Sequence, residues 1–156
     1  MIIIDKKSLS ALVEKASSTK RKRLNYNFHS TDADTLQRLL NAIEPDTYVQ
    51  PHKHENPDKR EVFIIIQGIA AIICFDDEGD IIEYSLLNRD EHVYAVEIPP
   101  RVWHTLVSLK EGTVLYEIKD GPFDANNDKK FAPWAPAEGD SLCELYLKNL
   151  KKRIKL

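Results

Sequence analysis

The chain has 156 residues, 42% of them hydrophobic, with a formal net charge of −3 at pH 7 and a pI near 6.0. A chain of this length can bury about two-thirds of the surface that its unfolded form exposes, so we expect a single domain that needs no disulfide. The slightly acidic balance disfavours a nucleic-acid-binding protein, because such proteins usually carry a basic excess on one face.

The cysteines and the apolar runs indicate where such a protein would work. Cys74 lies in an apolar strand run and Cys143 in a predicted helix, so we expect two reduced, partly buried thiols. No apolar run is long enough to span a membrane, and the segment MIIID is too short for the core of a signal peptide. The expected location is therefore the cytoplasm, with no membrane and no nucleic acid as partner.

Residues 1–45 are predicted to form a helix, a strand and a short second helix. Apolar residues recur at helical spacing in residues 5–16, and again in residues 36–43 before Pro45. Between them, residues 23–29 alternate with period two, which predicts a strand with one apolar and one polar face. The polar face could line a cavity inside a barrel, or it could face solvent on an edge strand. Its members are Arg23, Asn25, Asn27 and His29.

Residues 46–119 carry a series of short strand patterns separated by turn signals. This is typical of an all-β sandwich or barrel, and the predicted helices would lie outside it. The expected strands are residues 48–54, 61–67, 69–75, 80–87, 92–98, 103–109 and 113–119.

Residues 120–156 are predicted to form an ordered arm followed by a helix. The arm, residues 120–139, is rich in Pro, Gly and Asp, yet it carries Phe123, Phe131 and Trp134. A free tail would not keep such aromatics in water, so we expect the arm to pack on the barrel. The helix follows, and its basic end, residues 148–155, suits the negative end of the helix dipole.

Four metal-ligand residue types occur at the predicted strand ends. His52 and His54 are two residues apart and so share one face of an extended strand, Glu61 opens the next strand, and His104 follows a turn built on Pro99 and Pro100. Three imidazoles and a carboxylate suit Fe²⁺, Mn²⁺, Co²⁺, Ni²⁺ or Zn²⁺. A bound ion would keep one or two positions open for a substrate or water.

These four residues resemble the two short motifs of the cupin superfamily. The first motif reads H-x-H, a gap, E, six residues, then G, and it is matched by His52, His54, Glu61 and Gly68. The second reads P-x-G-x-x-H and is matched from Pro99 to His104, except that Arg101 replaces the glycine. This replacement weakens the turn prediction, because arginine tolerates a positive φ poorly, but it does not change a ligand.

A wider resemblance covers residues 21–139. The segments LNAIEPDTYVQPHKH, FDDEG, EIPPRVWHT and DKKFAPWAPAEGD are similar to WbuC-type cupin metalloproteins, which are found with bacterial O-antigen gene clusters. The resemblance implies a single cupin domain over residues 1–156, with a jelly-roll-like β-barrel, peripheral helices and a metal site. It also favours the inward orientation of the polar face of residues 23–29.

The expected substrate contacts follow from these predictions. We expect them from Arg23, Asn25, Asn27 and His29, and from Tyr48 and Gln50, which share the face of His52 and His54. Arginine can hold a carboxylate or phosphate with two hydrogen bonds. His29 is also the candidate for a catalytic residue.

Two functions remain open. The first is a metal-dependent enzyme, of isomerase, epimerase or oxygenase type, acting on a small polar or anionic metabolite. The resemblance implies a sugar or nucleotide-sugar in O-antigen and lipopolysaccharide synthesis. The second is a metal-containing saccharide-binding or regulatory module without turnover. Because cupins often pair through edge strands, we also expect a homodimer.

Overall fold

The computed structural model describes residues 1–154. Lys155, at the predicted basic end of the last helix, and Leu156 lie outside the described residues. The elements in chain order are α1 (Lys6–Ser18), β1 (Arg23–Asn27), β2 (Leu36–Ile43), β3 (His52–Lys53), β4 (Glu61–Gln67), β5 (Ile69–Phe75), β6 (Ile81–Asn88), the short 3₁₀ helix η1 (Arg89–Glu91), β7 (Ala95–Ile98), β8 (Trp103–Ser108), β9 (Thr113–Asp120), β10 (Lys130–Phe131) and α2 (Cys143–Arg153).

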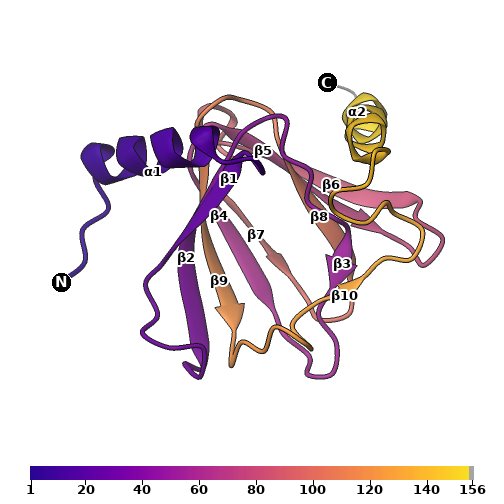
Figure 1. Ribbon diagram of the computed structural model, residues 1–156, viewed down its shortest axis with the longest axis horizontal. Helices are drawn as coiled ribbons and strands as arrows, with labels where there is room; N and C mark the ends of the chain where they lie inside the picture. Colours follow the sequence, from indigo (N-terminus) through magenta and orange to yellow (C-terminus); the bar gives the residue numbers. More distant parts are fainter. Residues whose placement is uncertain (155–156) are drawn as a thin grey trace.

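Two five-stranded antiparallel sheets face each other, and one helix lies outside each of them (Figure 1). The strand orders are β1-β2-β9-β4-β7 and β10-β3-β8-β5-β6. Neighbours in the sheets come from distant parts of the chain, as in a jelly roll. The prediction of an all-β, jelly-roll-like fold with peripheral helices is confirmed.

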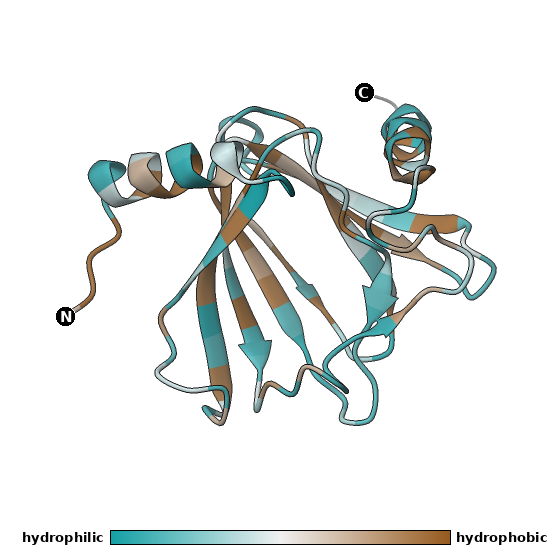
Figure 2. Cartoon of the chain, viewed as in Figure 1, coloured by the Kyte–Doolittle hydropathy of each residue, from teal (hydrophilic) through white to brown (hydrophobic). Residues whose placement is uncertain are grey.

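The space between the sheets is apolar at one end and polar at the other. On β4, Glu61, Phe63 and Ile65 are all buried and alternate with less buried neighbours. Phe63 and Ile65 join the apolar core between the sheets, which includes Ile72 of β5 and Leu106 of β8. Figure 2 shows apolar and polar bands along these strands. The apolar end holds the sheets together and leaves the Glu61 end free for polar side chains.

Helix α1 covers the outer face of the first sheet. Asp5 caps its start, accepting a hydrogen bond from the backbone N–H of Ser8, and the Ser8 hydroxyl returns a contact to the cap. Leu12 and Ala16 of the helix pack against Leu40 of β2. The predicted first helix is therefore confirmed as a packing helix.

The predicted short helix at residues 36–43 is wrong, because the structure has strand β2 there. β2 lies between β1 and β9, so one face points between the sheets and the other lies under α1. Its burial is nearly continuous from Leu39 to Ile43. A strand covered on both faces loses the alternation that marks strands in a sequence, and its leucines then fit helical spacing equally well.

The arm, residues 120–139, and helix α2 cover the second sheet. Leu147 and Leu150 of α2 pack in a cluster with Ile73 and Val107. Trp134 of the arm lies 5.1 Å from Phe75, measured between ring centroids. The prediction that the arm is ordered on the barrel is confirmed.

Two smaller expectations can be compared directly. Cys74 and Cys143 are both free and half-buried, as predicted. Among residues 1–154, no helix combines the length and apolar character needed to cross a membrane.

Candidate metal centre

The structure brings His52, His54, Glu61 and His104 together inside the polar end of the barrel. His52 of β3 is paired directly with His104 of β8, Glu61 is the first residue of β4, and His54 follows β3. Each offers one ligand atom, and these atoms all lie within 4.8 Å of one another. All four residues are no more than 3% exposed, so the cluster is shielded from bulk water.

Backbone carbonyl groups fix how the three imidazoles are oriented. In each ring, Nδ1 faces a carbonyl oxygen and therefore carries the proton, which leaves the lone pair on Nε2. The ring then turns Nε2 toward the centre of the cluster. The carbonyl partners are Gln50 for His52, Val102 for His104, and Asp128 for His54.

The atoms facing the centre need a cation. Nε2 of His52 and Nε2 of His54 are buried and have no hydrogen-bond partner among the described residues. Nε2 of His104 lies 2.9 Å from a carboxylate oxygen of Glu61. Two acceptor atoms at that distance repel unless a proton or a metal ion lies between them. A divalent ion would satisfy all four groups at once, so the residues present fit a metal.

Burial and pairing shift the titration of these groups in the direction that favours metal ligands. Burial, with lesser contributions from neighbouring positive groups, lowers the pKa of His52 well below its usual range. Burial alone would raise the pKa of Glu61, but hydrogen bonds with His104 and His54 outweigh it and hold that pKa well below the usual range. Both groups are thus in the deprotonated form that binds a metal.

Arg101 takes the backbone conformation that glycine has in the usual second motif. Its φ is +68°, in the left-handed region. Its backbone N–H donates to the carbonyl oxygen of His54 at 3.0 Å, and its Nε donates to Asp58 at 2.8 Å. The turn therefore forms despite the replacement, and these contacts compensate for the steric cost of a side chain at positive φ.

A cavity of about 240 Å³ adjoins the cluster, with Glu61 in its wall. Arg23, Asn25 and Asn27 of β1 also line it, because they share the inward face with Asn41 of β2. Of the two orientations open for this polar row, the structure has the inward one. The opposite face of β1, with Leu24 and Tyr26, lies toward α1.

The other expected contact residues differ in position. His29 lines the cavity, and its Nδ1 accepts a hydrogen bond from the backbone N–H of Arg38 at 3.2 Å. Tyr48 and Gln50 are not among the cavity residues in the described part of the chain. The hydroxyl of Tyr48 instead donates to the carbonyl oxygen of Pro136, and Oε1 of Gln50 accepts from the backbone N–H of Glu138. Both side chains hold the arm.

Sequence reasoning missed three charged residues of this cavity, namely Glu117, Lys119 and Asp128. Glu117 and Lys119 of β9 are buried, while Ile118 between them is less so. Lys119 donates to Asp128 of the arm at 2.5 Å, and Lys59 donates to the same carboxylate at 2.8 Å. Alternation on β9 was the available signal, since Glu117 and Lys119 share a face with Leu115.

Glu117 is a second carboxylate beside the candidate ligand Glu61. It is 8% exposed, and Nδ2 of Asn41 donates to it at 3.1 Å. Burial, followed by the negative charge of Glu61, raises the pKa of Glu117 to about 8. At neutral pH the metal-free protein therefore holds a proton at this position, which is the property of a general acid.

This shift predicts how the stability of the metal-free protein depends on pH. The pKa is raised from 4.5 to about 8, so the stabilisation is complete below pH 4.5 and is lost as the pH rises toward 8. The loss is at most about 1.4 kcal/mol per pH unit in that range. Urea unfolding between pH 5 and 8 should therefore show a decline that Glu117→Gln flattens. An identical decline in the variant would contradict the assignment.

Comparisons with known proteins support the fold. CapF of Staphylococcus aureus, described as a capsular polysaccharide assembling protein, matches at 24% identity and a TM-score of 0.57 over 69% of this chain and 28% of CapF. A cupin 2 domain-containing protein of Halorhodospira halophila matches at 17% identity and 0.52 over 89% and 88%. Oxalate decarboxylase of Bacillus subtilis matches at 17% identity and 0.53 over 70% and 27%.

These likenesses establish the cupin fold and no more, because the identities are low. The chain spans less than a third of the length of CapF. A search among curated proteins finds no match. Residues 4–87, more than half of the chain, match the family model described as a domain of unknown function, DUF6016. With its cupin fold and its buried cluster of three histidines and a glutamate, the chain belongs to the DUF6016 family.

Proposed function

We propose that this protein is a metal-dependent enzyme that acts on a small polar or anionic sugar-type metabolite. The observation that carries the proposal is the position of the cavity. It adjoins the four candidate ligands at Glu61, and its walls carry the buried acid Glu117 and the buried cation Lys119. A pocket that combines a metal-ligand set with perturbed titratable groups is a strong candidate for an active site.

The metal would be held by His52, His54, Glu61 and His104. Their imidazole and carboxylate groups suit Fe, Mn, Zn, Ni or Co ions. When bound, such an ion would polarise a substrate oxygen and stabilise negative charge that develops on it.

The remaining roles belong to side chains of the cavity wall. Glu117, which holds a proton near neutral pH, is suited to exchange it with the substrate. Lys119 would offset negative charge on the substrate, while Asn25 and Asn27 would orient its hydroxyl groups through hydrogen bonds. His29, also in the cavity wall, is the candidate for a second proton-transfer group.

The biological setting is inferred from likeness. The resemblance to WbuC-type cupins and the printed description of CapF as a capsular polysaccharide assembling protein both point to surface polysaccharide synthesis. We therefore assign the protein to O-antigen or related polysaccharide synthesis in the bacterial cytoplasm, with a sugar or nucleotide-sugar as substrate.

A two-step experiment tests the enzymatic role. Metal-loaded protein is first screened by thermal shift against sugar phosphates, sugar acids and nucleotide-sugars, and each stabilising compound is then followed by NMR for chemical change. We expect at least one compound to be converted, and Glu117→Gln to slow the conversion by about 100-fold or more while metal content is unchanged. Stabilisation without any conversion would instead indicate a non-catalytic saccharide-binding or regulatory module.

We also propose a homodimer, on the grounds that β1, β7, β10 and β6 are the edge strands of the two sheets and could pair with a second copy. Sedimentation equilibrium at micromolar concentration should give twice the chain mass of 17.9 kDa. A single-chain mass would contradict the dimer.

A further inference from the structure

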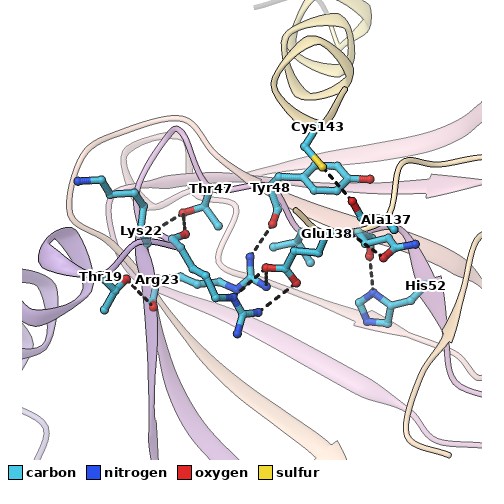
Figure 3. A network of polar contacts seen from close by, with 12 residues as sticks. Thr19, Lys22, Arg23, Thr47, Tyr48, His52, Ala137, Glu138 and Cys143 are labelled. Atoms are coloured by element: carbon cyan, nitrogen blue, oxygen red, sulfur yellow. Dashed lines mark hydrogen bonds and ion pairs between the residues drawn. The ribbon is translucent and has the colours of Figure 1, made fainter. Parts of the chain in front are cut away.

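The arm, residues 120–139, places a carboxylate on two arginines of the cavity wall. Arg21 donates to both oxygens of Glu138, from Nε at 2.8 Å and from Nη2 at 3.1 Å. Arg23 donates from Nη2 to the same carboxylate at 2.6 Å. Figure 3 shows Glu138 turned toward Arg23. Because both arginines line the cavity, this contact lies at its edge.

Arg23 is already fixed in position for binding. Its side chain is 13% exposed, and its Nη1 donates to the carbonyl oxygen of Tyr48 at 2.5 Å. Burial disfavours the charged form and lowers the pKa of Arg23, and the carboxylate of Glu138 counteracts this. A guanidinium that is mostly removed from water and held by the backbone loses little freedom when it binds an anion.

The charges of this cluster do not balance. Two guanidinium groups share one carboxylate, which leaves an excess of one positive charge at the cavity edge. A phosphate group carries up to two negative charges and three acceptor oxygens, so it matches two guanidinium groups better than a carboxylate does. The vacant charge therefore favours a phosphate over a single carboxylate.

Glu138 can leave without releasing the arm. Its side chain is 36% exposed, and an ion pair this open to solvent contributes at most about 1 kcal/mol. Other contacts hold the arm: Ala132 donates its backbone N–H to the carbonyl oxygen of Pro51 at 2.9 Å, and Pro136 accepts from the hydroxyl of Tyr48 at 2.8 Å. Replacing the Glu138 contact thus changes the cavity edge and leaves the fold intact.

We propose that Arg21 and Arg23 form a phosphate-binding subsite, which Glu138 occupies in the ligand-free protein and which a phosphate group of the ligand takes over. The inference rests on the proposed function in one respect, that the cavity receives a ligand. It narrows the substrate class to phosphorylated metabolites that are short enough to reach from the two arginines toward Glu61, since all three side chains line one cavity.

Calorimetric titration with inorganic phosphate at constant ionic strength tests the subsite without any turnover. Removing the internal competitor with Glu138→Gln should tighten phosphate binding by about fivefold to tenfold. Adding Arg23→Gln to that variant should abolish the gain. Glu144→Gln, an equal charge change at an exposed position of α2, serves as the control and should bind like the parent protein.

Further arms keep the result unambiguous. Titrations before and after chelation separate binding at the arginines from coordination to a metal ion. If Arg23→Gln does not fold, Arg21→Gln replaces it, because the Arg21 side chain is 62% exposed. A gain that is no larger than that of Glu144→Gln, that survives loss of the arginine, or that is equally large with acetate would overturn the phosphate subsite. The enzymatic role would fail separately, through absence of conversion.

Discussion

Replacing His52 or His104 with alanine should remove the bound metal from the purified protein. Each change deletes one of the four ligand atoms that lie within 4.8 Å of one another. Since loss of a group that merely orients a ligand already costs about 10-fold to 100-fold in metal affinity, loss of a ligand should cost more than that. Metal analysis of protein expressed without metal supplements should fall from about one ion per chain to nearly none.

His92→Ala is the matched control. His92 is exposed, and its Nδ1 contacts the hydroxyl of Tyr94 at 3.0 Å, well apart from the cluster. The control should keep the metal content of the parent protein. Equal metal content in the control, His52→Ala and His104→Ala would contradict the site.

Asp128→Asn should destabilise the protein by about 3–5 kcal/mol, because it leaves two lysines buried without their counter-charge. The side chains of Lys59, Asp128 and Lys119 are 2%, 3% and 6% exposed. Asparagine keeps the size of the side chain and the backbone carbonyl that faces His54, so the change isolates the charge. The free energy of unfolding, measured with urea, should fall by that amount.

An exposed ion pair at the end of β9 provides the control for this change. Asp120 accepts from Nε of Arg60 at 2.9 Å, but the two side chains are 31% and 63% exposed. Asp120→Asn should therefore cost less than about 1 kcal/mol. Equal costs for the two substitutions would show that burial of the Asp128 cluster does not contribute as argued.

The sequence predicted the later strands well because these strands keep the expected alternation. The bounds of β4 and β5 agree with the predicted segments 61–67 and 69–75. The strand expected at residues 48–54 is reduced to His52–Lys53. Pro51 has no N–H to donate to a neighbouring strand, which accounts for the shortening on its N-terminal side.

The four candidate ligands could be found from spacing, whereas their surroundings could not. His52, His54, Glu61 and His104 occur in short motifs at predicted strand ends. Glu117 lies in a strand whose neighbouring residues are buried on both faces, so the sequence did not fix which residues point inward.

The contacts of the arm were equally hidden. Asp128 and Glu138 belong to a segment without a regular period, yet they contact Lys59 and Arg21, which are distant in the chain. Aromatic residues in the arm predicted that it would pack, but long-range partners of a loop follow from the folded topology.

The central claim is that three imidazoles and one carboxylate hold a single divalent ion inside the barrel. The most direct test is a crystal structure of metal-loaded protein with anomalous scattering data collected at the absorption edge of the metal. The account predicts one strong anomalous peak bounded by Nε2 of His52, His54 and His104 and by the carboxylate of Glu61. No peak among these atoms, or a peak held by other residues, would contradict it.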